Sequence, residues 1–296
     1  MSNWPRPRSR LDWRGVLHPG PWVGARAPLW AVALAGAIVL SVHGLQLAED
    51  WVGLPKHGPL TLVRLVLAVA LVLGIYAVCV RLGERRKVNE LAPPRLVPEL
   101  CAGLAGGAAM FCVVMGVLLL GGWYQVSLSP AGPPWRALGA GFGNGTIEEL
   151  IFRGVLMRLL WEAFGLPAAL AVSSATFGLA HLLNPQHSLM GALSIIVEAG
   201  IVLGALFALT GRLWASIGTH AGWNFTQGYV FGADVSGVDL GGYWLHAVPT
   251  DGASWLMTGS EFGPEASLVA VVVGAAAGCL ILLFVWRRGA AFGGAG

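Results

Sequence analysis

Charged side chains are scarce in this chain. Of its 296 residues only 11% are Asp, Glu, Lys or Arg, whereas about 25% would be usual in a soluble globular domain. Hydrophobic residues make up 56% of the chain, and its mean hydropathy is +0.70. The shortage of charge excludes a soluble globular domain and indicates an integral membrane protein.

Cysteine is also scarce. The four cysteines show no CxxC pair and no disulfide-framework spacing, and they lie in or beside apolar segments: Cys79, Cys101, Cys112 and Cys279. We interpret them as small packing residues. The apolar run 29–47 lacks a small-residue cleavage site after it, so it is predicted to be a retained span and not a signal peptide.

Long apolar runs are what the chain has in abundance. Segments of about 20 residues suffice to cross a hydrocarbon core of about 30 Å. We therefore expect an all-α, polytopic membrane protein with about eight transmembrane helices in a single membrane domain, residues 29–286. The expected spans are 29–47, 60–82, 100–122, 136–161, 167–184, 188–209, 212–232 and 267–286.

Positive charge predicts the orientation of these spans. The net charge is only +3, and it lies mainly in loops and tails, which excludes an argument for a nucleic-acid partner. Residues 234–265 hold five acids and no Lys or Arg. The positive-inside rule then places both the basic N-terminal tail, 1–28, and the C-terminal tail, 287–296, in the cytoplasm. A seven-span alternative makes the fourth and fifth segments re-entrant.

Two glutamates and an arginine interrupt the fourth span. An ionisable group near the bilayer centre costs about 2.5 to 3.5 kcal/mol, so such groups pair, line a wet cavity or do chemistry. Glu149 and Arg153 are four residues apart in the orientation that favours an ion pair. Glu148 projects about 100° away around the helix and is free to face a cavity. The alternative is a polar seam in which both acids satisfy the arginine.

Two later spans add polar residues that suit hydrolysis. His181 ends the fifth span, and His220 and Asn224 lie one helical turn apart in the seventh. A buried carboxylate such as Glu148 is a competent base for water, with His181 sharing the hydrogen bonds of that water. His220 and Asn224 could donate to an oxyanion.

A zinc site would use the same residue types. The chain has no HExxH pair, however, and the candidate ligands are spread over separate helices, so the spacing favours a site without a metal or other cofactor.

Glycine spacing predicts close helix contacts beside these residues. Gly103 and Gly107 have the small-xxx-small spacing of packed membrane helices. The alternating glycines of 139–145 lack the spacing and the lysine of a phosphate-binding loop, so we interpret them as packing residues too.

The polar residues form three motifs in a fixed order: EExxxR at Glu148, Glu149 and Arg153, FxxxH at Phe177 and His181, and HxxxN at His220 and Asn224. Together they resemble the motifs of the CAAX protease and bacteriocin-processing (CPBP) family, whose members resemble the Ras-converting CAAX endopeptidase. The resemblance covers about residues 85–237.

The resemblance implies an intramembrane glutamate endopeptidase acting on a membrane-embedded or membrane-tethered peptide or protein. Glu148 with His181 would activate water, and His220 and Asn224 would form the oxyanion hole. Glu149 and Arg153 would be a supporting pair. The breadth of the family also implies a prokaryotic cell membrane.

Two other functions remain open at this stage. An ion-coupled transporter could use Glu148, Glu149, Glu198 and the histidines as a proton relay, although no inverted repeat is visible. A scaffold or immunity protein could keep the same fold without catalysis. Glu198 itself is interpreted as part of a polar seam, with a cavity position or a pairing with Arg212 or a histidine as the alternatives.

Overall fold

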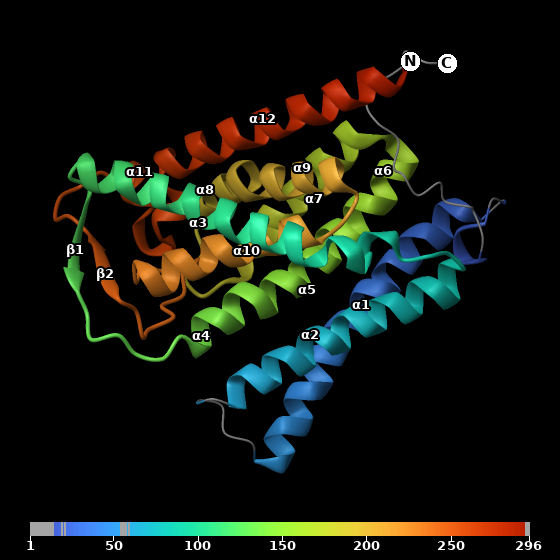
Figure 1. Cartoon of the computed structure of the whole chain (residues 1–296), viewed down its shortest axis with the longest axis horizontal. Coiled ribbons are helices and arrows are strands. Elements are labelled where there is room, and N and C mark those ends of the chain that lie inside the picture. The colour runs from blue at the N-terminus through green and yellow to red at the C-terminus, as the bar shows by residue number, and fades with distance from the viewer. Residues whose placement is uncertain (1–14, 19, 21, 54–57, 59, 294–296) are drawn as a thin grey trace.

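A computed structural model describes residues 15–293, except 19, 21, 54–57 and 59, and these residues are nearly all helical (Figure 1). The predicted all-α class is confirmed. Most of the basic N-terminal tail, up to Arg14, lies outside the described residues. The first helix begins at Val23, within that predicted tail, and the last continues to Gly293, through most of the predicted C-terminal tail.

The α-helices are α1 (Val23–Val52), α2 (Leu60–Cys79), α3 (Leu96–Leu120), α4 (Trp135–Leu138), α5 (Gly145–Glu149), α6 (Arg158–Phe164), α7 (Leu166–Ala180), α8 (Leu189–Ile195), α9 (Ile201–Thr210), α10 (Trp214–Phe225), α11 (Trp255–Thr258) and α12 (Leu268–Gly293). Five π-helical segments extend or join them: η2 (Val80–Glu84), η5 (Gly139–Asn144), η6 (Leu150–Met157), η8 (Ile196–Gly200) and η9 (Thr226–Val230). The 3-10 turns are η1 (Gly15–Leu17), η3 (Asn89–Leu91), η4 (Pro93–Arg95), η7 (His181–Leu183), η10 (Ser260–Phe262) and η11 (Pro264–Ala266).

Six helices in the described part of the chain are long and apolar enough to cross a membrane: Val23–Val52, Leu60–Glu84, Asn89–Leu120, Leu166–Leu183, Leu189–Thr210 and Leu268–Arg288. The predicted count of eight is therefore not confirmed. The two remaining predicted spans are helical, at 135–164 and 214–230, but the first is rich in charged residues and the second is short. These two segments carry most of the polar motif residues, which is why they differ from ordinary spans.

Helix α10 lies at the centre of the bundle (Figure 1). Its residues 214–223 are all buried, although they include serine, threonine and histidine. A helix that is enclosed on every side by protein can carry such side chains because neighbouring helices, and not lipid, surround them.

Glycines on α3 and α10 allow these two helices to touch along their backbones. A Cβ atom at Gly103 would lie 2.4 Å from the carbonyl oxygen of Ala215, and one at Gly107 would lie 2.1 Å from that of Thr219. Among the alternating glycines, Gly141 packs on Ala221 and Gly145 on the ring of His220. The packing role predicted for these glycines is confirmed, except at Gly139, where a Cβ atom would meet nothing within 4 Å.

A small antiparallel sheet lies at one end of the bundle, where loops alone were expected (Figure 1). Strand β1 (Tyr124–Leu128) follows α3, and β2 (Leu245–Pro249) precedes α11, with Tyr124 opposite Pro249 and Leu128 opposite Leu245. The sheet ties the connection before α4 to the long connection after α10.

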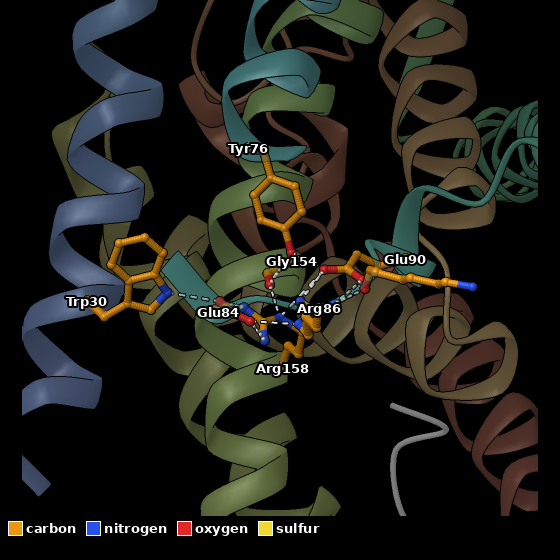
Figure 2. Close-up of polar contacts among 8 residues, drawn as sticks. Trp30, Tyr76, Glu84, Arg86, Glu90, Gly154 and Arg158 are labelled. Carbon is orange, nitrogen blue, oxygen red and sulfur yellow. Dashed lines mark hydrogen bonds and ion pairs between the residues drawn. The ribbon is translucent and has the colours of Figure 1, made fainter. Parts of the chain in front are cut away.

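A buried ionic network ties α1 and α2 to the helix that carries the acidic motif (Figure 2). Arg158 donates to both carboxylate oxygens of Glu84, at 2.7 and 2.9 Å. Arg86 bridges Glu84 and Glu90.

The network also includes hydrogen bonds to the backbone carbonyl of Gly154. In Figure 2 the hydroxyl of Tyr76 and the Nε of Arg158 both donate to the carbonyl oxygen of Gly154, at 2.9 and 2.7 Å. This carbonyl lies in the π-helical segment η6, one residue after Arg153. The network therefore holds the helix directly beside the acidic motif.

Candidate functional site

A cavity of about 240 Å³ lies between α5, α7, α10 and the connection after α10. Its walls include Glu148 from α5, His181 from the turn after α7, and His220 and Asn224 from α10. The four residues that the sequence predicted as one site, from three separate segments, therefore line one cavity.

Glu149 and Arg153 form a fully buried ion pair beside this cavity. The Nη1 of Arg153 donates to Oε1 of Glu149 at 2.9 Å, as the four-residue spacing predicts. The other end of the guanidinium donates to the carbonyl oxygen of Gly200 at 3.2 Å and lies 4.3 Å from the ring centre of Phe177. These contacts offset the cost of burying the charge.

Glu149 has a second partner that the sequence did not predict. The Nδ1 of His220 lies 3.1 Å from Oε1 of Glu149. A carboxylate only accepts, so Nδ1 carries the proton of this hydrogen bond. The opposite ring nitrogen, Nε2, lies 3.8 Å from Oε2 of Glu148. His220 is thus held between the two glutamates of one motif.

Glu148 differs from its neighbour in having few partners. Its side chain is 31% exposed, whereas that of Glu149 is 0% exposed. Among the described residues, no group forms a hydrogen bond with Oε2 of Glu148; Oε2 of Glu149 also lacks a partner, but Oε1 of Glu149 is held by Arg153 and His220. The carboxylate of Glu148 faces the cavity with a free lone pair, as the predicted division between the two acids requires.

The ring of His181 is oriented by its own helix. Nδ1 lies 2.9 Å from the carbonyl oxygen of Phe177. The carbonyl only accepts, so Nδ1 bears the hydrogen, and Nε2 of the neutral ring is left as an acceptor. The ring also packs edge-on against Phe177, at 4.9 Å between centres.

Phe177 accounts for the aromatic position of its motif. Besides His181 it contacts the guanidinium of Arg153, and its ring centre is 6.1 Å from that of His220. The buried ring of Phe177 therefore packs against residues of all three motifs.

The long connection after α10 closes the cavity. Val235, Ser236, Val238 and Leu240 line its wall, and the side-chain amide of Asn184 donates to the carbonyl oxygen of Ser236 at 2.9 Å. Asn184 and Ser236 were missed as site residues because no local spacing relates them.

A smaller cavity of about 40 Å³ adjoins the first and shares four of its lining residues, His181, His220, Asn224 and Ser236. Glu198 and Glu265 are added to its lining. Arg212 instead binds Glu99. The suggested pairing of Glu198 with Arg212 is therefore wrong, and Glu198 lies at a cavity.

The residues described here contain no group of three His, Cys, Asp or Glu side chains placed to hold a metal ion.

Part of the chain matches a known protein family. Residues 130–226, which contain all three motifs, match the family described as type II CAAX prenyl endopeptidase Rce1-like. The match supports a CAAX protease-like family for this chain and confirms the resemblance noted in the sequence. Comparisons with curated proteins and with solved structures give no significant match.

Proposed function

We propose that this integral membrane protein of CAAX protease-like type is an intramembrane endopeptidase that hydrolyses a peptide bond of a membrane-associated protein or peptide. The observation that carries the proposal is the single cavity lined by Glu148, His181, His220 and Asn224. The family match over the same segment supports it independently.

The first chemical step uses the free carboxylate. Glu148 takes one proton from a water molecule. Nε2 of His181 accepts a hydrogen bond from the other O–H of that water and so orients the water oxygen. The oxygen attacks the carbonyl carbon of the scissile peptide bond, and the carbonyl electrons move to its oxygen. General base catalysis of this kind contributes about 10²-fold to 10⁴-fold.

The second step needs donors for the oxyanion. Asn224 donates from its amide. His220 donates from Nε2, which requires a doubly protonated ring because Nδ1 already donates to Glu149. The carboxylates of Glu148 and Glu149 favour that cationic ring. Glu148 then returns its proton to the leaving nitrogen as the C–N bond breaks and the oxyanion electrons re-form the carbonyl, giving a carboxylic acid and an amine; transfer of the acid proton to the amine leaves a carboxylate and an ammonium group.

Glu149 and Arg153 act as positioning residues. Glu149 holds the ring of His220, and Arg153 neutralises Glu149 while anchoring it to η8. No metal ion is required by these steps.

The purified protein should cleave a membrane-tethered peptide, and Glu148→Gln and His181→Ala should each lose about 10²-fold or more of kcat while melting at the temperature of the unchanged protein. His187→Ala is the matched control, since this histidine is exposed and lines neither cavity. Activity should persist in strong chelator. Full activity of both Glu148→Gln and His181→Ala would exclude this mechanism, and proton-coupled uptake without proteolysis would favour a transporter.

The orientation proposed for the enzyme follows its charges. The ionic network of Glu84, Arg86, Glu90 and Arg158 belongs to the basic, cytoplasmic side, and the acidic connection after α10 to the opposite side. We propose a prokaryotic cell membrane with both termini in the cytoplasm.

A further inference from the structure

The inner cavity contains two carboxyl groups that the proposed hydrolysis does not use. Glu198 comes from η8, in the middle of the membrane-spanning helix Leu189–Thr210, and Glu265 comes from η11 at the entrance to α12. Both are almost fully buried, with 2% and 1% exposure. Their position directly behind His181 and His220 makes this cavity an extension of the candidate site.

Glu198 lacks a donor. In the described part of the chain no side chain or backbone group forms a hydrogen bond or ion pair with its carboxyl group, and the carboxyl group of Glu265 lines the same cavity. Burying a charged or polar group without a partner is costly. The backbone at Glu198 is held in place, since a Cβ atom on Gly274 of α12 would lie 2.4 Å from its Cα.

Glu265 is held by Ser236. Its Oε1 accepts from the backbone nitrogen and from the hydroxyl of Ser236, both at 2.7 Å. These hydrogen bonds fix the loop that closes the larger cavity. They also fix the carboxyl group of Glu265 at the wall that both cavities share.

The charges around the two cavities do not balance. Glu148, Glu149, Glu198 and Glu265 bring four carboxyl groups, and Arg153 brings one guanidinium. Even with a cationic His220 the described groups carry an excess of negative charge when the acids are ionised. A site of this composition favours a cationic group on its ligand.

The size of the inner cavity limits that group. A single water needs about 10 to 15 Å³ by a comparable measure, so a cavity of about 40 Å³ takes a tip of only a few atoms. A compact ammonium group fits this space better than a planar guanidinium. The apolar lining, which includes Ile195, Val202 and Leu203, suits the methylene next to the nitrogen.

We propose that the inner cavity is a specificity subsite that binds a primary ammonium group of the substrate between Glu198 and Glu265. The inference rests on the proposed peptidase function. The larger cavity holds the scissile bond, and the ammonium group reaches the inner cavity past the shared residues His181 and Ser236. Its source is either a lysine side chain near the scissile bond or the free amino terminus of a peptide.

Peptide cleavage tests the subsite. Membrane-tethered peptides that differ only in Lys, Arg or norleucine beside the scissile bond should be cleaved with kcat/KM at least 10-fold higher for Lys than for norleucine, and with Arg below Lys. A second pair of peptides, one with a free and one with an acetylated amino terminus, tests whether the amino terminus supplies the ammonium group. Equal rates for all peptides in the unchanged protein would overturn the proposal, whatever the variants do.

The Glu198→Gln variant tests the residue. The ratio of kcat/KM for the Lys peptide to kcat/KM for the norleucine peptide should fall to about one in this variant, while Glu261→Gln, at an exposed acid outside both cavities, keeps the ratio of the unchanged protein. Loss of both activities in equal proportion, or retention of the preference, would contradict a specificity role for Glu198.

Binding separates this proposal from the proposed function. The Glu148→Gln variant should bind the lysine peptide at least 10-fold more tightly than the norleucine peptide, and adding Glu198→Gln should abolish the difference. Such binding without any cleavage by the unchanged protein would retain the subsite and refute the peptidase. Cleavage by the unchanged protein without a difference in binding between the two peptides would retain the peptidase and refute the subsite.

Discussion

At the scale of single residues, the two adjacent glutamates have unequal surroundings. Glu149 is fully buried and is shared by Arg153 and His220, whereas Glu148 is partly exposed and lines a cavity. The motif therefore combines a structural acid with an acid that is available for chemistry, and substitution should separate the two roles.

We expect Glu149→Gln to lower both stability and activity, because it leaves Arg153 as a buried charge without its partner. Breaking a buried ion pair costs about 3 to 5 kcal/mol. Glu148→Gln should change the free energy of unfolding by less than about 0.5 kcal/mol, as expected away from paired groups. Melting temperatures in detergent, measured beside peptidase rates, check this contrast. Equal melting temperatures for the two variants would show that Glu149 is not a structural acid.

Glu265 should make the stability of the protein depend on pH. Burial raises its pKa above the ordinary value of 4.5, while the hydrogen bonds from Ser236 oppose that rise. From pH 4.5 up to the raised pKa, the folded protein keeps a proton that the unfolded chain has released. The free energy of unfolding therefore falls as pH rises through this window, by about 1.4 kcal/mol for each unit of difference.

The Glu265→Gln variant removes this proton while its side chain can still accept from Ser236. We expect its melting temperature to fall less than that of the unchanged protein as pH is raised from 4.5. Parallel profiles for the two proteins would show that Glu265 is not the group responsible.

At the scale of elements, glycine contacts decide how α10 sits against α3. The carbonyl oxygens of one helix approach the Cα atoms of the other at Gly103 and Gly107. His220 and Asn224 follow the contacted residues of α10, so any displacement of this helix moves the proposed oxyanion donors.

Gly107→Ala should therefore reduce both stability and activity. The added Cβ would lie 2.1 Å from the carbonyl oxygen of Thr219, and overpacking of this kind costs about 1 to 3 kcal/mol. Gly106→Ala is the matched control, because a Cβ at that position meets no atom within 4 Å. It should be neutral or stabilising by up to about 1 kcal/mol, since alanine is the better helix former. Thermal melting and peptide cleavage of both variants measure the difference, and equal effects would rule out the close contact.

At the scale of the whole molecule, α1 and α2 form a pair at the edge of the bundle and join it through the ionic network (Figures 1 and 2). Arg158 is the residue that links Glu84 of η2 to the carbonyl of Gly154. The network thus joins the pair α1 and α2 to η6, the π-helical segment that contains Arg153.

Arg158→Met should destabilise the protein by about 3 to 5 kcal/mol, because Glu84 would be left buried with half of its hydrogen bonds. Arg81→Met, at an exposed arginine of η2, the segment that carries Glu84, should change stability by less than about 0.5 kcal/mol. Chemical denaturation in detergent compares the two. A neutral Arg158→Met would show that the attachment does not depend on the network.

The sequence alone determined those features that depend on residues close to one another along the chain. Apolar runs predicted an all-α membrane protein, and the spacing of Glu149 and Arg153 predicted their ion pair, because helical geometry brings residues four apart together. The three motifs predicted the family that the comparison supports. The number of spans was less certain, since charged and short helices inside a bundle lack the pattern that lipid contact imposes.

Only the tertiary structure decided which distant groups meet. It brought Glu148, His181, His220 and Asn224 to one cavity, paired His220 with Glu149, and placed Glu265 and Ser236 at the wall of the site. No local pattern records such contacts, because they depend on how helices separated by tens of residues pack against each other.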